Sequence, residues 1–196
     1  MDKLLHIIQG NVRDIEAVKK TLSSKHGQAS IIISTFGGQA SFQISTFSLK
    51  MDDPRTCTDG LKTILSGLKE LDLVVKPQLI VLSSMGVLAE RDFPILFYPI
   101  CKWILSEVMD DKRYMEANLA DESQRAGISS SVIVRAPALT DAEGRGVPAI
   151  TAGTGRERPM GYSVARKDVA EYIFERLIKE ESMPAGTARD VSIAYR

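Results

Sequence analysis

Leu79-Ile80-Val81-Leu82-Ser83-Ser84-Met85-Gly86 is an apolar run that ends in two serines and a small-residue turn. The run lacks the polar and apolar alternation of a strand with one face in water, so it is typical of a strand buried in a parallel sheet. Four further runs share this character, namely residues 4–8, 30–35, 132–135 and, more weakly, 191–194. The sequence therefore predicts five buried strands.

Segments that we expect to be helices fill the intervals between these runs. They cover residues 13–24, 54–71, 100–109, 112–125 and 164–178. Asp14, Asp53 and Ser163 are placed to cap three of them, and Asp110 with Asp111 is expected to form a solvated helix junction. Strands that alternate with helices predict an α/β fold with right-handed crossovers.

The length of 196 residues fits one domain covering residues 1–196, because domains usually contain roughly 100 to 200 residues. Residues 144–161 are rich in glycine, and we expect them to form one long loop of the kind that is often functional.

The composition excludes several classes of protein. Lys and Arg number 25 and Asp and Glu also number 25, without a one-sided block, so we expect neither nucleic acid nor an anionic membrane as a partner. Two cysteines, Cys57 and Cys101, are too few for a disulfide framework or a zinc site. The most apolar run, residues 93–105, falls short of the ~20 residues of a membrane span, and the start lacks a signal-peptide core. We expect a cytoplasmic protein.

Small residues follow the predicted strands, where open parallel sheets bind ligands. Gly10, Gly37 and Gly86 would let the backbone approach a ligand closely, and Ser83 or Ser84 would offer a hydroxyl group. Glycine and serine also end strands in any α/β protein because turns require them. The strand ends therefore leave open whether this edge is a binding site.

Five segments fall in the order seen in one known family. They are residues 7–14, 32–37, 79–87, 132–141 and 166–170, and together they span nearly the whole chain. In this order they resemble the atypical short-chain dehydrogenase/reductases, in particular the NmrA-like, NAD(P)-binding branch. The resemblance implies a Rossmann-like parallel sheet with flanking helices and NAD or NADP as the cofactor.

The resemblance also implies roles for individual residues. The cofactor would lie along Gly10, Asn11 and Val12 at the adenine, Thr35, Phe36 and Gly37 at the ribose, Ser83, and Pro137, Ala138 and Leu139 beside the nicotinamide. Ser84 would be the catalytic-region serine, and Lys112 matches the family lysine. The family order Arg-Pro is replaced here by Arg135-Ala136-Pro137.

The family opens with a strand, a Gly-rich turn, a helix and a second strand, and no segment of this sequence matches them. The resemblance therefore implies a fold truncated at the amino end by roughly 40 to 60 residues, including the turn that binds the pyrophosphate. We expect residues 4–8 to pair directly with residues 30–35, because unpaired ladders leave backbone groups unsatisfied.

A Tyr-x-x-x-Lys pattern offers a catalytic pair. Tyr98 and Lys102 follow Ser84 closely, and such a tyrosine can act as a general acid beside a lysine. Pro99 disfavours a shared helix face, and the family order points to Lys112 instead. Tyr98 and Lys102 are therefore interpreted either as this pair or as structural residues of an apolar flap.

Three functions remain open from the sequence. The first is an NAD(P)-dependent oxidoreductase acting on a small apolar carbonyl or alcohol in accessory metabolism. The second is a nucleotide-sensing regulator without catalysis, and the third is a cofactor-free isomerase or cyclase that uses the vacated cleft. In each case the partner is a small molecule, and residues 93–105 are expected to form a pocket lid or the face of a homodimer.

Overall fold

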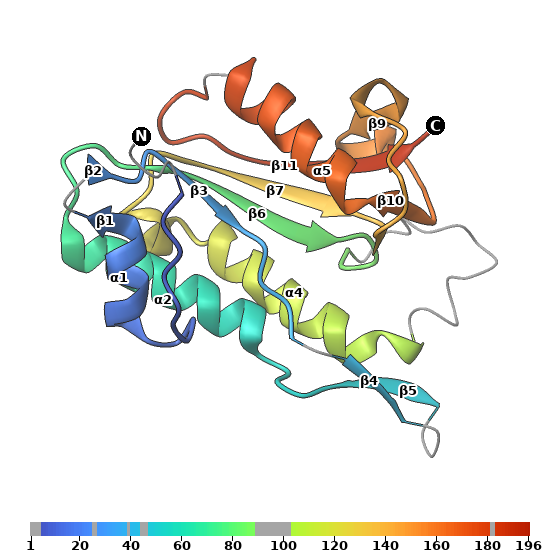
Figure 1. Cartoon of the computed structure of the whole chain (residues 1–196), viewed down its shortest axis with the longest axis horizontal. Helices are drawn as coiled ribbons and strands as arrows, with labels where there is room; N and C mark the ends of the chain where they lie inside the picture. The colour runs from blue at the N-terminus through green and yellow to red at the C-terminus, as the bar shows by residue number, and fades with distance from the viewer. Residues whose placement is uncertain (1–4, 25–26, 39, 44–46, 89–102, 181–182) are drawn as a thin grey trace.

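A central sheet with helices on both faces organises the chain (Figure 1). The structure, a computed structural model, describes residues 5–24, 27–38, 40–43, 47–88, 103–180 and 183–196. None of the helices in these ranges has both the length and the apolar character needed to cross a membrane.

The sheet is mostly parallel, as the sequence predicts. Its strands, in spatial order, are β3 (Ile31–Ser34), β6 (Gln78–Ser84), β7 (Ser130–Ala136), β11 (Ala188–Tyr195) and β9 (Ile150–Gly153). The first four run parallel, and β9 pairs antiparallel with β11. Four of the five predicted apolar runs are therefore strands, and the α/β fold class is confirmed.

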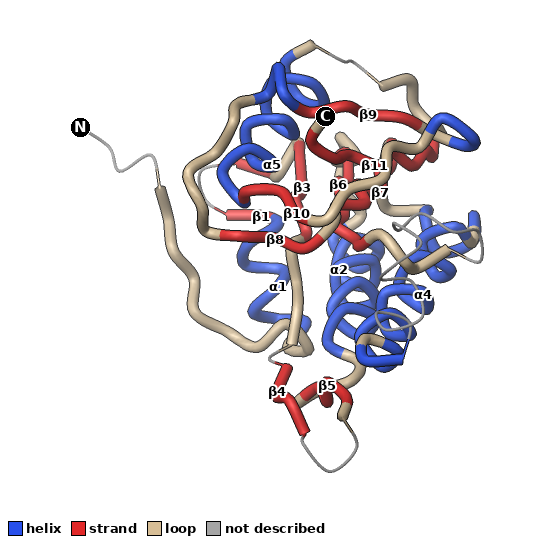
Figure 2. The backbone as a smooth tube through the Cα atoms, turned by 90° about the vertical axis from the view of Figure 1, so that its right-hand side faces the viewer, coloured by secondary structure: helices blue, strands red, loops and turns tan. Residues whose placement is uncertain are grey.

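The fifth run is the exception, because residues 5–8 belong to no strand. Leu5 and Ile7 are 72% and 85% exposed, and β3 pairs only with β6 within the described residues, so the predicted pairing with residues 30–35 is wrong. The segment instead forms an extended trace that leads into α1 (Figure 2). Gly10 lies so close to this helix that a Cβ there would stand 2.7 Å from the Cβ of Ala17.

Three helices cover one face of the sheet and one helical segment covers the other (Figures 1 and 2). The first three are α1 (Ile15–Leu22), α2 (Thr56–Leu71) and α4 (Ser106–Ala120), and the opposite segment is α5 (Arg166–Tyr172) continued by η4 (Ile173–Lys179). Leu79 and Val81 pack toward the first group, whereas Ile80 and Val134 pack toward α5. This alternation along buried strands produces two hydrophobic clusters.

The helix starts agree only in part with the sequence. Asp14 caps α1 as predicted, since its Oδ1 accepts the backbone N–H groups of Glu16 and Ala17. The cap position of α2 is Arg55 rather than Asp53, and Ser163 lies in a strand rather than at a helix start.

One helix, α4, replaces the predicted junction at residues 110–111. It runs without a break through Asp110 and Asp111 and gives way to η1 (Glu122–Arg125). Asp111 is only 3% exposed, so the solvated junction predicted there is wrong. A run of charged residues does not reveal that one of its members is buried by a neighbouring helix.

Several shorter elements lie outside the central sheet. They are β1 (Ser23–Ser24) with β2 (Gly27–Gln28), β4 (Ala40–Gln43) with β5 (Ser48–Met51), β8 (Ala138–Thr140) with β10 (Ser163–Ala165), η2 (Val147–Ala149) and η3 (Gly155–Glu157). Residues 144–161 thus contain β9 and two short helices rather than one loop.

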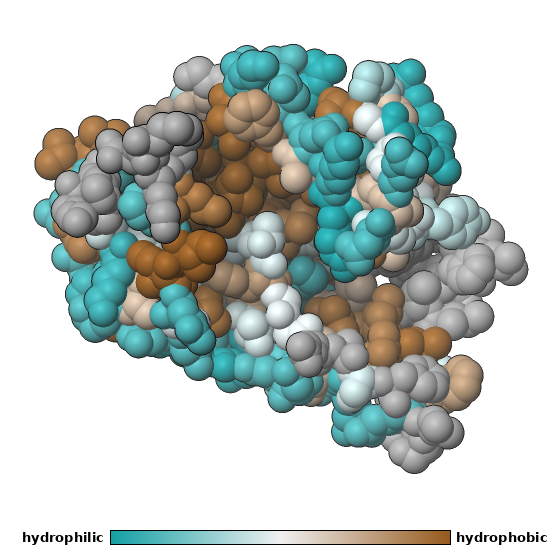
Figure 3. Space-filling view, in the orientation of Figure 1, coloured by the Kyte–Doolittle hydropathy of each residue, from teal (hydrophilic) through white to brown (hydrophobic). Residues whose placement is uncertain are grey.

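An apolar hollow lies on the side of the sheet that faces the viewer in Figure 3, over β3 and β6. Ile33 of β3 is 47% exposed and Ile8 is 43% exposed. The edge of the sheet at β3 is therefore much less covered than its centre, where Leu79 and Ile80 are fully buried.

Leu79→Ala is expected to lower the free energy of unfolding by about 2–5 kcal/mol, because the side chain is fully buried between β6 and the helices. Val74→Ala is the control, since Val74 is 93% exposed, and a change below about 0.5 kcal/mol is expected. Urea unfolding measures both. Equal effects at the two positions would contradict this packing.

Candidate functional site

The carboxyl ends of β3, β6 and β7 lie at one edge of the sheet, because the three strands are parallel neighbours. Ser84 ends β6 opposite Ala136, and the backbone N–H of Met85 donates to the carbonyl of Ala136 at 2.9 Å. Pro137 follows directly, and residues 35–37 follow β3. The structure thus brings three of the predicted ligand-binding segments to one edge.

The fourth predicted segment, residues 10–12, lies next to this edge, because Val12 and Phe36 pack against the same residue of α2. A Cβ on Gly60 would stand 2.7 Å from the ring of Phe36 and 2.9 Å from Val12, so both side chains rest on this glycine. Only a residue without a side chain allows that approach. A cavity of about 260 Å³ is lined by Gly10, Asn11, Val12 and Phe36 among others.

Backbone geometry and ion pairs fix residues 10–14. The side chain of Asn11 accepts the backbone N–H of Arg13 at 2.9 Å, which closes a local turn. Arg13 reaches Asp59 at 2.9 Å and forms a two-point pair with Asp53. The hydrogen bonds from Arg13 hold the pKa of Asp53 far below its usual range. The loop is therefore tied to the start of α2.

The two serines at the end of β6 continue opposite faces of the sheet, and Lys112 lies on only one of these faces. Ser83 continues the face of Leu79 and Val81, toward α4, whereas Ser84 continues the opposite face. The ammonium of Lys112 on α4 is 3.5 Å from the carbonyl of Leu82. Lys112 therefore shares its side of β6 with Ser83, whose hydroxyl is buried and finds no hydrogen-bond partner among the described residues.

Two groups of predicted residues remain. Tyr98 and Lys102 lie outside the described residues, so their pairing stays a prediction. Pro137 leads into β8, which contains Ala138 and Leu139 and pairs with β10. Ala138 is exposed at this edge.

The N–H groups of two helix starts are already used by carboxylates. Asp14 occupies the start of α1, and Asp111 accepts the N–H groups of Cys57 and Thr58 at the start of α2. These starts are therefore not available for a phosphate. The backbone at Gly37 is open, since a Cβ placed there would meet nothing within 4 Å, whereas Gly153 is closed against the carbonyl of Glu157.

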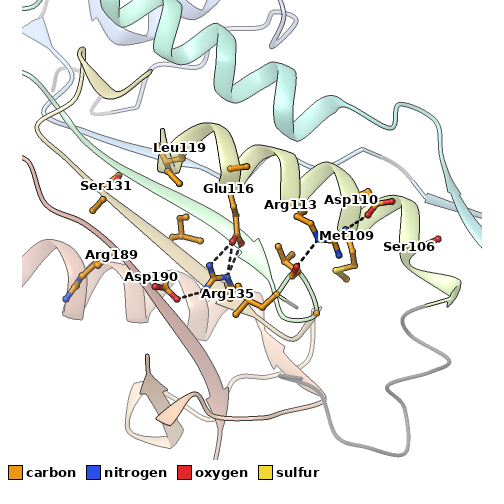
Figure 4. Close-up of a pocket in the computed structure, with 17 residues that line it drawn as sticks. Ser106, Met109, Asp110, Arg113, Glu116, Leu119, Ser131, Arg135, Arg189 and Asp190 are labelled. Atoms are coloured by element: carbon orange, nitrogen blue, oxygen red, sulfur yellow. Dashed lines mark hydrogen bonds and ion pairs between the residues drawn. The ribbon is translucent and has the colours of Figure 1, made fainter. Parts of the chain in front are cut away.

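A buried ion pair joins α4, β7 and β11 next to this edge. Arg135 is 5% exposed and donates to Glu116 through Nε at 3.0 Å and Nη2 at 2.7 Å, and it also pairs with Asp190 (Figure 4). Burial lowers the pKa of Arg135, but hydrogen bonds and the charge of Glu116 outweigh burial and raise it. Arg135 lies inside an apolar strand run, and such a charge requires a buried partner.

The ion pair also lines a groove of about 820 Å³ that runs along α4 (Figure 4). The groove extends from residues 86–88 after β6 to Ser131 and Ala188 near the starts of their strands. It therefore leads away from the carboxyl edge, and Met109, Leu119 and Ile133 make much of its wall apolar.

Asp168 anchors the loop that precedes β9. Its carboxylate accepts the hydroxyl of Tyr195 at 2.5 Å and the backbone N–H groups of Arg145 and Gly146 at 2.6 and 3.0 Å. A Cβ on Gly144 would stand 1.9 Å from this carboxylate, so glycine is required there. The hydrogen bond from Tyr195, more than any other contact, lowers the pKa of Asp168.

A mostly parallel sheet with helices on both faces defines a Rossmann-like α/β protein, a class that binds its ligands at the carboxyl ends of the strands. The chain belongs to the NAD(P)H-binding family, whose sequence pattern matches residues 2–180. This match confirms the cofactor class, NAD or NADP, that the sequence predicts.

Relatives agree with this assignment. "Reductase pytE" of Aspergillus terreus is 33% identical in an alignment of 207 positions that covers 97% of this chain and 78% of that protein. "Oxidase pynE" of Aspergillus niger is 28% identical in an alignment of 213 positions that covers 91% of this chain and 75% of that protein.

Solved structures share the fold. A short-chain dehydrogenase/reductase from Veillonella parvula in complex with NADP has a TM-score of 0.66 at 14% identity, covering 98% of this chain and 74% of that chain. The reductase ChuY from Escherichia coli O157:H7 has a TM-score of 0.63 at 18% identity, covering 96% and 74%.

Glu116→Gln is expected to destabilise the protein by about 3–5 kcal/mol, because it leaves the buried Arg135 without its main counter-charge. Arg135→Met combined with Glu116→Leu removes both charges and is expected to recover most of that loss. Denaturant unfolding compares the variants. A double variant as unstable as the single one would contradict the account of the ion pair.

Asp168→Asn is expected to lower the free energy of unfolding by about 1–3 kcal/mol at neutral pH, since it disturbs three buried hydrogen bonds. The pKa of Asp168 is lowered in the folded protein, so its stabilisation is present above the unfolded pKa of about 3.9 and disappears as the pH falls through the folded pKa.

The difference in unfolding free energy between wild type and Asp168→Asn should therefore narrow below about pH 4. Asp141→Asn, at an exposed carboxylate, is the control and should show little difference at any pH. A gap for Asp168→Asn that is the same at pH 7 and pH 3 would show that its carboxylate charge is not responsible.

Proposed function

We propose that this protein is an NmrA-like, NAD(P)-dependent oxidoreductase of the atypical short-chain dehydrogenase/reductase type, acting on a small apolar carbonyl or alcohol in accessory metabolism. The observation that carries the proposal is the convergence of residues 10–12, 35–37, 83–84 and 137–139 at one sheet edge in a chain of the NAD(P)H-binding family. The names of the two Aspergillus relatives, a reductase and an oxidase, support redox chemistry.

The residues at the edge fit the cofactor. Gly37 leaves its backbone open and Ala138 is exposed, while Val12 and Phe36 form an apolar surface against α2. We assign Gly10, Asn11 and Val12 to the adenine side, Thr35, Phe36 and Gly37 to the ribose and residues 137–139 to the nicotinamide side. No Gly-x-x-Gly-x-x-Gly turn occurs in these 196 residues, so the proposal assigns no pyrophosphate contact to this chain.

The bound cofactor would supply or accept the hydride, and the protein would position the substrate and the proton. We assign Ser84 to polarise the substrate carbonyl, and Lys112 to hold a positive charge at the end of β6 on the other face, beside Ser83. Ser83 lies on the same side of β6 as Lys112, and its buried hydroxyl has no hydrogen-bond partner among the described residues. Tyr98 and Lys102 remain proposed as a general acid pair.

A nucleotide-sensing regulator is the second candidate. Val108 stands four residues before Lys112, where the family order places the catalytic tyrosine. A protein with this substitution would bind the cofactor without turnover.

Calorimetric titration with NADPH and NADH is expected to give a sub-millimolar Kd for at least one of them, followed by turnover with a panel of small carbonyl compounds. Lys112→Met should lower kcat by about 10²- to 10⁴-fold, the usual contribution of a positioned proton-transfer group. Lys62→Met, at an exposed lysine of α2, is the control. Binding without turnover favours the sensor, and no binding of either nucleotide contradicts both candidates.

A further inference from the structure

The first turn of α2 lies between two parts of the proposed site. On one side, the side chains of Val12 and Phe36 pack against Gly60. The thiol of Cys57 donates to the carbonyl of Phe36 at 3.3 Å. On the other side, the same turn contacts α4 through Asp111. The turn thus connects the segment assigned to the cofactor with the helix that carries Lys112.

Asp111 makes this connection with every polar group it can offer. Its Oδ2 accepts the backbone N–H of Cys57 at 2.8 Å and its Oδ1 accepts that of Thr58 at 2.9 Å. The hydroxyl of Thr58 donates to the backbone carbonyl of Asp111 at 3.0 Å. A residue that is 97% buried therefore holds two helices together with three hydrogen bonds, in the partial positive field of a helix start.

A cap within α2 would stabilise that helix equally well without reaching α4. The cap position of α2 is Arg55, whose side chain makes no capping hydrogen bond. An aspartate or serine at residue 55 could serve the same N–H groups locally. Supplying the cap from α4 instead fixes the distance and the register between the two helices.

The packing of α4 alone fixes its position poorly. Two of its five buried residues are carboxylates, Asp111 and Glu116, which bind α2 and Arg135 respectively. Lys112 lies next to Asp111, and its Nζ is 3.5 Å from the carbonyl of Leu82. Burial raises the pKa of the Cys57 thiol in the first turn of α2 to about 11, and the charge of Lys112 opposes that rise.

We propose that Asp111 is a positioning residue, which holds Lys112 in place against β6 and links its position to the segment that contacts the cofactor. The proposal rests on the proposed function for its catalytic consequence. The geometric part, that Asp111 determines where Lys112 stands, holds independently of catalysis.

Asp111→Asn is the test, because the amide keeps the size of the side chain but presents an N–H₂ group to helix N–H donors. Asp110→Asn is the matched control, since it removes the same charge from an adjacent, half-exposed residue that pairs with Arg113 on the surface. Both purified variants are compared with wild type for the Kd of NADPH, for kcat and KM, and for the pH profile of kcat.

Asp111→Asn is expected to lower kcat about ten- to hundredfold with a change in NADPH affinity of less than about threefold, because a small misplacement of a reacting group has a large kinetic effect. The pH profile of kcat is expected to differ from that of wild type. Asp110→Asn should leave kcat, NADPH affinity and the pH profile of kcat as in wild type. A loss of thermal stability in Asp111→Asn with normal kcat and pH profile per folded molecule would overturn the proposal.

A second readout separates this inference from the proposed function. Reductive methylation with ¹³C-formaldehyde labels the lysines, and Lys112→Arg identifies the signal of Lys112 by NMR. The signal and its titration are expected to change in Asp111→Asn and to stay as in wild type in Asp110→Asn. If wild type binds no nucleotide but this pattern is seen, only the proposed function fails. An unchanged Lys112 signal in Asp111→Asn overturns the positioning role.

Discussion

The buried guanidinium of Arg135 is the constraint on which the proposed site depends. It lies on β7 within the sheet, and its hydrogen bonds to Glu116 and its pair with Asp190 hold α4 and β11 on either side. A buried charge is costly unless it is paired, so the charge favours a packing of these three elements that keeps the pair intact. Because α4 also carries Lys112 and Asp111, the pair contributes to the position of α4 beside β6. Strand register places Ser83 directly opposite Arg135, so these two residues share one row across the sheet.

The sequence predicts the parallel sheet well because the deciding information is local. Residues 79–82 and 132–134 are apolar on both faces, and no arrangement other than burial in a sheet with two covered faces suits them. Asp14 is also readable, since an N-cap acts within three residues of its own position. Residues 5–8 carry the same pattern but belong to no strand, although β3 pairs only with β6 among the described residues. A local pattern shows that a segment suits a strand, but not whether the path of the chain brings it beside a partner. Gly10 packs against Ala17 and carries the chain along α1 instead.

The candidate site is harder to predict from the sequence, because much of its geometry depends on contacts between residues that are far apart in the chain. The order of residues 10–12, 35–37, 83–84 and 137–139 along the chain and the parallel strands are sufficient to expect them at one edge. The hydrogen bonds and ion pairs that stabilise this edge join residues far apart in the sequence. Asp111 looks like part of a solvated charged run until α2 is placed beside it, and Arg135 requires a partner that the sequence does not indicate among its many carboxylates. The sequence also does not predict β9 within its glycine-rich segment, because β9 pairs with β11, which lies about 40 residues further along the chain.

The proposed site has an apolar part formed by Val12 and Phe36 against α2, an open backbone at Gly37, and polar groups at the end of β6, with Ser83 and Lys112 on one face and Ser84 on the other. The central claim is that NAD(P)H lies along this edge. Titration of ¹⁵N-labelled protein with NADPH and with NADH, followed by amide NMR, tests it most directly. The account predicts that shift changes concentrate at residues 10–12, 35–37, 83–86 and 138–139. Changes confined to the groove between α4, Ser131 and Ala188, with none at the carboxyl edge, would contradict it.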